Sequence, residues 1–279
     1  MQIVDSHVHV WMNNQKYPWA AEEQDIPLED ALPEDLIRIL NRNRVNWAVL
    51  VQNIKYRWDN SYVADVIKAY PSLFMGVCRV DPERPDSPDQ LSFWTNEHGF
   101  RGVRLSPEAD ARGDWFTGPL MLPLFKRSAD LKIPVLILTK PSRLPDLASL
   151  LEKVPEVNVI IDHMADCLSK DKGDFEKLMM LARYPRVYLK IGHIPHNSSE
   201  SYPWQDTHRQ MERVCLEYGA RRIMWGSDWP FLLSKMDYSQ SISYVQCELQ
   251  FLTQDDREWI LGKTALQFWP FNQMKNTGC

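Results

Sequence analysis

Short apolar runs alternate with amphipathic segments along the whole chain, and this alternation predicts its fold. Residues 47–52 (WAVLVQ) are apolar almost throughout, which is typical of a strand buried on both faces of a parallel sheet. The segments between the runs carry apolar residues at helical spacing, and one begins with Pro33, a residue favoured in the first turn of a helix. We expect strands at residues 3–11, 47–52, 74–80, 101–105, 133–138, 157–162, 187–191 and 222–225.

Helices are expected between these strands and after the last one. Eight strand–helix units with no linker between them, in a chain of 279 residues, predict an α/β fold. The specific expectation is a single (β/α)8 TIM barrel that forms one domain over residues 1–279. A doubly wound open sheet is the competing architecture, but no GxGxxG turn follows the first strand. The expected helices are residues 33–40, 62–70, 89–97, 123–131, 144–153, 175–183 and 207–218, with a helical tail from Ser239.

Composition and charge argue against nucleic acid and membrane as partners. The net charge of −5 offers no basic surface for nucleic acid, and no apolar run is long enough to span a bilayer. The N-terminal residues lack the features of a signal peptide. The five cysteines are scattered without a CxxC pair, which indicates reduced thiols and a cytoplasmic location. A small molecule is therefore the expected substrate, and the aromatic loops around Trp19 and Trp204 are compatible with a homodimer.

Two histidines in the first strand are the first candidates for chemistry. In a TIM barrel the active site lies at the carboxyl ends of the strands. The two-residue period of a strand places His7 and His9 on one face with Asp5, and Val4 and Val8 on the other. Two neutral imidazoles on one face can bind a single divalent cation. The alternative is a pair of hydrogen-bonded histidines on a half-exposed edge.

Polar residues at the ends of other strands extend this group. The first strand pairs with the eighth when a barrel closes, which brings Asp228 next to His7 and His9. His163, after the sixth strand, is expected to face them across the mouth. The alternatives are a core histidine for His163 and a cap of the turn before Pro230 for Asp228. Convergence from three separate parts of the chain favours a functional site.

Three further strand ends carry less specific polar residues. Arg104 fits either a substrate contact or a salt bridge within the barrel, and Gln52 fits either a substrate contact or a plain strand end. Lys190 faces the site if its neighbour Ile191 faces outward, and faces away in the opposite case. Asp162 is expected to point away from the site and either to cap the loop or to pair outside it.

With these residues the sequence resembles the amidohydrolase superfamily, in its amidohydrolase 2 branch. Within that branch it is similar to the sugar-lactonase group, which includes L-fuconolactonase, L-rhamnono-lactonase and 2-pyrone-4,6-dicarboxylate lactonase enzymes. The resemblance extends from one end of the chain to the other. It is carried by Asp5-Ser-His7-Val-His9-Val-Trp11, Ile161-Asp162-His163, Trp225-Gly-Ser-Asp228-Trp-Pro230 and the segment 261–269.

The resemblance implies hydrolysis of a small lactone, sugar-derived or a dicarboxylate, by attack of water. Asp228 would be the general base, and His163 would act beside it in catalysis. His7, His9, His163 and Asp228 would hold one Zn²⁺ ion, or the histidines would polarise the carbonyl directly. Substrate would be bound by Gln52, Arg104, Lys190 and Trp229.

One departure from the superfamily pattern leaves the metal open. Many metal-dependent members carry a histidine ligand on the fifth strand, whereas residues 136–140 here read LILTK. The lactonase group also includes members that work without a metal. The alternative function in the same branch is a zinc-dependent decarboxylase of an aromatic or muconate-type acid, which the missing histidine disfavours. A non-enzymatic scaffold is disfavoured by the complete His and Asp set.

Overall fold

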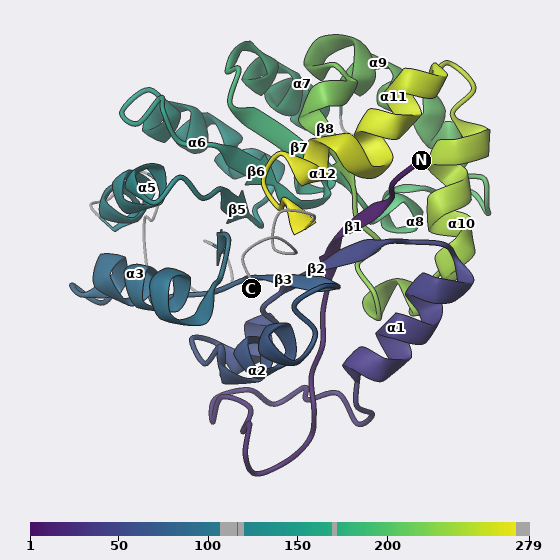
Figure 1. Cartoon of the computed structure of the whole chain (residues 1–279). Helices are drawn as coiled ribbons and strands as arrows, with labels where there is room; N and C mark the ends of the chain where they lie inside the picture. Colours follow the sequence, from purple (N-terminus) through teal and green to yellow (C-terminus); the bar gives the residue numbers. More distant parts are fainter. Residues whose placement is uncertain (107–115, 117–119, 169–171, 272–279) are drawn as a thin grey trace, which may run out of the picture.

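The computed structural model describes residues 1–106, 116, 120–168 and 172–271. Eight parallel strands form the centre of the molecule, and the helices lie outside them (Figure 1). The TIM-barrel fold is therefore confirmed, and most strands are shorter than the apolar runs that predict them. The strands are β1 (Val4–Val8), β2 (Trp47–Val51), β3 (Phe74–Val77), β4 (Val103–Leu105), β5 (Val135–Ile137), β6 (Val159–Ile161), β7 (Val187–Ile191) and β8 (Ile223–Trp225).

The strands form two sheets that meet at both edges. One sheet has the order β1-β2-β3 and the other the order β4-β5-β6-β7-β8. Between β3 and β4, the Cys78 amide donates to the carbonyl of Gly102 over 3.0 Å. Between β1 and β8, Asp228 donates to the carbonyl of His7 and His9 donates to that of Trp229, both over 2.8 Å. The contact between β1 and β8 closes the barrel and brings the histidines of the first strand beside Asp228.

The helices follow the strands as predicted, with differences near the end of the chain. The short helix α8 was not expected, and the tail after Ser239 is divided into segments rather than continuous. Most of the loop between β4 and α5, and Cys279, lie outside the described residues. The helices are α1 (Pro33–Arg42), α2 (Ser61–Ala69), α3 (Ser87–His98), α5 (Met121–Asp130), α6 (Leu144–Leu151), α7 (Lys172–Met180), α8 (Ile194–Asn197), α9 (His208–Tyr218), α10 (Tyr238–Ser243), α11 (Gln254–Glu258) and α12 (Thr264–Leu266).

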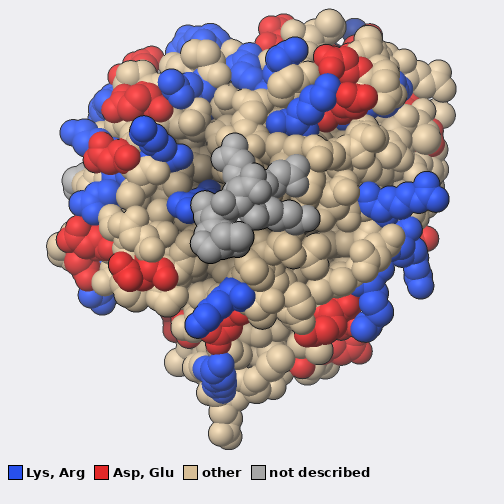
Figure 2. All heavy atoms as spheres, in the orientation of Figure 1, with Lys and Arg blue, Asp and Glu red and all other residues tan. Residues whose placement is uncertain are grey.

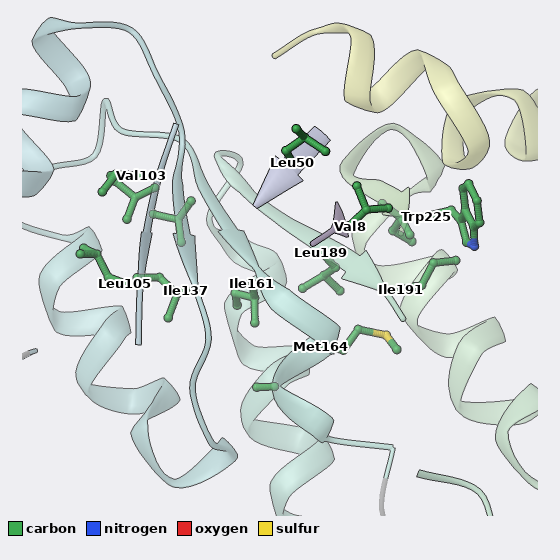
Figure 3. Close-up of a cluster of buried hydrophobic side chains, with 14 of the residues drawn as sticks. Val8, Leu50, Val103, Leu105, Ile137, Ile161, Met164, Leu189, Ile191 and Trp225 are labelled. Carbon is green, nitrogen blue, oxygen red and sulfur yellow. The ribbon is translucent and has the colours of Figure 1, made fainter. Parts of the chain in front are cut away.

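The apolar core has two parts, because alternate strand residues face opposite sides of the barrel wall. The larger part lies between the strands and the helices and includes Leu50 and Ile161 (Figure 3). The smaller part combines inward-facing strand residues with Trp269 and Phe271 from the end of the described chain.

The first strand departs from the expected alternation. Val4 belongs to the inner part of the core and Val8 to the outer part, so the prediction that they share a face is wrong. The register of β1 against β2 shifts between Asp5 and Val8, which is the signature of a β-bulge. A bulge of this kind reverses which residues face inward beyond it.

Two surface observations bear on partners. No helix in the described ranges combines the length and the apolar character needed to cross a bilayer. Figure 2 shows Lys and Arg interspersed with Asp and Glu over the visible face, in agreement with the small net charge of −5.

Candidate active site

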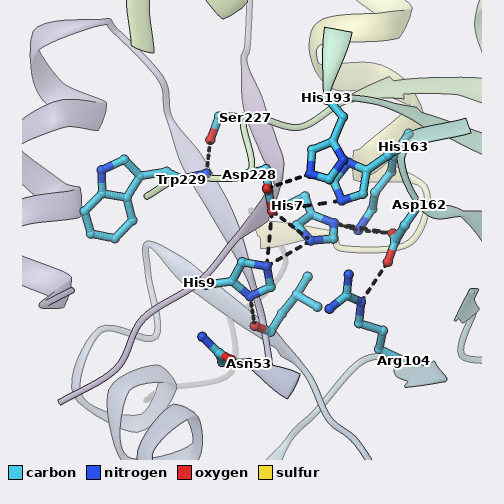
Figure 4. Close-up of polar contacts among 12 residues, drawn as sticks. His7, His9, Asn53, Arg104, Asp162, His163, His193, Ser227, Asp228 and Trp229 are labelled. Carbon is cyan, nitrogen blue, oxygen red and sulfur yellow. Dashed lines mark hydrogen bonds and ion pairs between the residues drawn. The ribbon is translucent and has the colours of Figure 1, made fainter. Parts of the chain in front are cut away.

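Five side chains converge on one point at the carboxyl ends of the strands (Figure 4). His7 and His9 come from β1 and the loop after it, and Asp228 follows β8. His9 Nε2 lies 3.2 Å from Asp228 Oδ1, and His7 Nε2 lies 3.6 Å from the same oxygen. His163 Nε2 lies 4.0 Å from Oδ1, whereas His193 Nε2 contacts the other oxygen, Oδ2, over 2.9 Å. The structure thus brings together the four residues expected at the metal and adds His193.

His193 was missed by the sequence reasoning, although it lies two residues after the end of β7. Burial acts to lower the pKa of His193, but its hydrogen bonds with Asp166 and Asp228 outweigh burial and raise it to about 9. Burial likewise acts to raise the pKa of Asp228, but the hydrogen bond from His193 holds it well below its usual value. Asp228 is therefore ionised at neutral pH, with an imidazolium on one of its oxygens.

The backbone that carries these groups is unusual. His163, His193 and Asp228 have φ values of 52°, 55° and 61°, in the left-handed region that side chains other than glycine rarely adopt. Such conformations cost about 1 kcal/mol or more each and concentrate at functional sites. They turn the chain sharply after β6, β7 and β8, so that the side chains beyond the strands point into the mouth.

Two glycines leave room for the imidazoles. A Cβ atom at Gly226 would lie 2.7 Å from His7 Cβ, and one at Gly192 would lie 2.9 Å from His163 Nδ1. Both separations are far below an ordinary van der Waals contact. The close approach of β8 to β1 and of β7 to β6 therefore requires glycine at these two positions.

The geometry of three donor atoms fits a divalent metal. His7 Nε2, His9 Nε2 and Asp228 Oδ1 form a triangle with sides of 3.2, 3.2 and 3.6 Å. Ligands of a tetrahedral zinc ion are separated by about 3.3 Å, given zinc–ligand bonds of about 2.0 Å. His9 Nδ1 lies 2.7 Å from the carbonyl oxygen of Val51, which fixes the proton on Nδ1 and leaves a lone pair on Nε2. Three protein ligands and one open position are the arrangement of catalytic zinc sites.

The expected four-ligand set is divided between two groups that share Asp228. The first group is His7, His9 and Asp228, and the second is His163, His193 and Asp228. The rings of His163 and His193 are stacked in parallel, with centroids 3.6 Å apart. Burial and the neighbouring charge of His193 hold the pKa of His163 well below its usual value, so this imidazole is neutral.

A buried network of charges lies beneath His7. Asp162 was expected to point away, and this expectation is wrong, because its side chain is fully buried under the site. Its Oδ2 accepts from Arg104 Nε over 2.8 Å, and its Oδ1 lies 3.4 Å from Lys190 Nζ. Lys190 faces the barrel interior, and burial lowers its pKa to about 8. Burial alone would raise the pKa of Asp162, but Lys190, His7 and Arg104 keep it well below its usual value.

The other expected substrate contacts, Gln52 and Trp229, are held by hydrogen bonds to the backbone of neighbouring segments. The Gln52 amide donates to the backbone carbonyl of Asp59, and its Oε1 is buried without a hydrogen-bond partner among the described residues. The indole of Trp229 points away from the imidazoles (Figure 4), and this residue contributes its backbone carbonyl to the contact with His9.

An aromatic wall beside His9 was not anticipated. The ring of Phe231 lies 5.4 Å from that of His9 and 5.3 Å from that of Trp11. Trp11 is buried whereas Phe231 remains 41% exposed, so the Phe231 ring is the part of this pair that a ligand can reach. The sequence signal was weak, because Phe231 follows the conspicuous segment 225–230 and carries no polar group.

Asp5 connects the first strand to the last. Its Oδ1 accepts from the amide of Ser227 over 2.9 Å, and its Oδ2 accepts from the hydroxyl of Tyr238 over 2.7 Å. Burial raises the pKa of Asp5 to about 6. Asp5 therefore holds the barrel closed next to His7, and it lies outside the group of imidazoles where alternation alone would place it.

A (β/α)8 barrel with imidazoles and a carboxylate at its mouth defines a class of hydrolytic enzymes that activate water beside a polarised carbonyl. The family model described as amidohydrolase matches residues 4–271, so the chain belongs to this family, in its amidohydrolase 2 branch. The chain is 28% identical to an L-fucono-1,5-lactonase of Burkholderia ambifaria, over 95% of this chain and 94% of that protein.

Solved structures agree on the fold. A probable 2-pyrone-4,6-dicarboxylic acid hydrolase from Acinetobacter baumannii superposes with a TM-score of 0.83 at 19% identity, covering 97% of this chain and all of the other. An amidohydrolase from Burkholderia multivorans with bound zinc superposes with a TM-score of 0.80 at 18% identity, covering 97% and 99%.

Proposed function

We propose that this protein hydrolyses a small lactone, with Asp228 as the general base. The observation that carries the proposal is the setting of Asp228 at the barrel mouth, where His193 holds one carboxylate oxygen and three other imidazoles lie within 4.0 Å of the second. The similarity to an L-fucono-1,5-lactonase supports a lactone as the substrate class.

In the proposed reaction Asp228 accepts a proton from water, and the water oxygen attacks the lactone carbonyl. The negative charge that develops on the carbonyl oxygen is stabilised by the imidazole of His7. Collapse of the tetrahedral intermediate breaks the ring C–O bond, and the ring oxygen takes up the proton that Asp228 received. The product is a hydroxy acid, and no atom other than those of water is added.

We further propose that His7, His9 and Asp228 bind a divalent metal ion, because the distances between their donor atoms fit one. These three residues would hold the metal, which supplies Lewis acidity toward the carbonyl and lowers the pKa of a bound water. His163, neutral and stacked on His193, faces the same carboxylate and is proposed to assist Asp228.

The roles of the remaining residues are revised by their contacts. Arg104 and Lys190 are engaged with Asp162, so we propose that they support His7 from below rather than bind substrate. Gln52 and the wall of Phe231 and Trp11 are proposed to contact the substrate. A homodimer and a cytoplasmic location stay predictions of the sequence.

The test is a panel of sugar lactones and lactone carboxylates, followed by acid release, for the wild-type protein and Asp228→Asn. Asp228→Asn should lower kcat by about 10³-fold or more, because the amide cannot accept the proton from water. Its melting temperature should stay close to that of the wild type. Unchanged turnover in the variant would remove Asp228 as the base, and release of carbon dioxide instead of ring opening would favour the decarboxylase alternative.

A further inference from the structure

One nitrogen of His7 has two buried neighbours of opposite hydrogen-bonding character. His7 Nδ1 lies 3.1 Å from Lys190 Nζ and 3.3 Å from Asp162 Oδ1, and all three side chains are fully buried. The contact with Lys190 has the geometry of a hydrogen bond. Asp162 Oδ1 receives no hydrogen bond from the residues that the structure describes. Lys190 is therefore the partner of this nitrogen in the observed arrangement.

The identity of that partner fixes the tautomer of His7. A lysine ammonium has three donors and no acceptor, so His7 Nδ1 must accept the hydrogen bond. A neutral imidazole that accepts at Nδ1 carries its proton on Nε2. The opposite holds for His9, whose Nδ1 donates to the Val51 carbonyl and whose Nε2 is an acceptor.

The distance between the two imidazoles agrees with this assignment. His7 Nε2 and His9 Nε2 are 3.2 Å apart, which suits one donor and one acceptor. Hydrogen bonds then run in one direction from Lys190 through His7 and His9 to the carbonyl of Val51. With the proton of His7 on Nδ1 instead, two lone pairs would face each other across this distance, which is the arrangement that a cation between them would require.

We infer that Lys190 is a positioning residue that holds His7 in the tautomer with a proton on Nε2, and that Asp162 offers the competing tautomer. With Lys190 as the partner, His7 presents an N–H group to the site and can donate a hydrogen bond to a carbonyl oxygen. With Asp162 as the partner, His7 presents a lone pair and can ligate a metal. This pair of residues therefore decides which of the two modes of carbonyl activation the site uses.

A purely structural role accounts less well for Lys190. Asp162 already has a cation in Arg104, whose Nε lies 2.8 Å from Oδ2, and its Oδ1 also lies 3.4 Å from Lys190 Nζ. A second fully buried cation beside a paired carboxylate adds a desolvation cost. A role in holding the tautomer of His7, through the contact of its ammonium with Nδ1, explains why a lysine occupies this buried position. The inference rests on the proposed function only in locating the site, because its tests do not require turnover.

The direct experiment is ¹⁵N NMR of the imidazoles in metal-free protein, with the His7 signals assigned from His7→Gln. The expected result is a protonated Nε2 and an unprotonated Nδ1 for His7 in the wild type. In Lys190→Met the proton should move to Nδ1, where Asp162 accepts it, while Lys190→Arg, which keeps the donor, should retain the wild-type pattern. A wild-type spectrum with the proton on Nδ1 would overturn the inference without any variant.

Zinc affinity, measured by competition with a chromogenic chelator, gives a second readout with opposite signs for two variants. Lys190→Met should bind zinc about tenfold more tightly than the wild type, and Asp162→Asn about tenfold more weakly, in the range of effects known for groups that orient metal-binding histidines. A general loss of structure would weaken zinc binding in both variants, whereas the inference requires tighter binding in one of them. Weaker zinc binding in both variants would overturn the inference. Absence of lactone hydrolysis, with the expected zinc affinities, would overturn only the proposed function.

Discussion

The close contact between β8 and β1 can be used to test whether it positions His7 for catalysis. In Gly226→Ala the new Cβ would lie 2.7 Å from His7 Cβ, 3.1 Å from the His7 amide nitrogen and 3.2 Å from Ser6 Oγ. Two carbon atoms in contact prefer a separation of about 3.5–4.0 Å, so His7 must move away by about 1 Å. Two of the three neighbours belong to the backbone or to the first side-chain atom, and a change of rotamer cannot relieve them.

Both stability and activity should respond. Overpacking of this kind costs about 1–3 kcal/mol of unfolding free energy, and a displacement of about 1 Å in a catalytic group costs about 10²-fold in rate. The measurements are urea unfolding and kcat/KM on the best lactone of the panel. Gly99→Ala is the control, because nothing lies within 4 Å of its added Cβ, although Gly99, unlike Gly226, has a positive φ of 75°.

The control should lose about 1 kcal/mol through its left-handed backbone and keep full activity. If Gly226→Ala loses stability to the same extent as Gly99→Ala but retains kcat/KM within twofold, the close packing of β8 on β1 does not aim His7, and the reasoning fails.

Two further predictions concern residues that the sequence did not reveal. The pKa of His193 is raised from 6.5 to about 9, so its contribution to stability should be complete below pH 6.5 and lost as the pH rises through 9. Urea unfolding of wild type and His193→Gln should therefore differ more at pH 6 than at pH 10, and an equal difference at both would contradict the assigned ion pair with Asp228. Phe231→Ala should raise KM about tenfold with a smaller effect on kcat, since it removes roughly 1.5 kcal/mol of apolar contact with substrate. Leu233→Ala, exposed on the same segment, is the control, and equal KM values for the two variants would exclude Phe231 from the substrate site.

The sequence predicted the barrel because burial on both faces leaves a signal that is independent of loops. It also predicted that His7, His9, His163 and Asp228 would meet, since each stands at a strand end where the topology leaves little choice. The errors at Asp162 and His193 have a common physical cause. The expectation for Asp162 extended the two-residue period of a strand beyond its end, and His193 was left out because it lies beyond the end of β7. Residues 163–166 and His193 instead turn through left-handed backbone.

Left-handed backbone is most often found at glycine, but none of residues 163–166 or residue 193 is a glycine. The chain after β6 therefore gave no sign that Asp162 and His163 both serve the site, one from beneath and one from the mouth. The bulge in β1 is a similar case, because the apolar residues on either side of it keep the pattern of a regular strand. Contacts with other strands, and not local preference, impose these conformations.

The two oxygens of Asp228 explain how one carboxylate can belong to both groups of imidazoles. His193 binds Oδ2 over 2.9 Å and supplies a positive charge there, which leaves Oδ1 directed toward His7 and His9. An oxygen in that position can take a proton from water or ligate a metal without any change in the position of the carboxylate. The choice between the two then depends on what His7 presents to the same space, an N–H group or a lone pair. Under the proposed function a histidine on β5 is not required, because His7, His9 and Asp228 supply the groups that either mode of carbonyl activation would use.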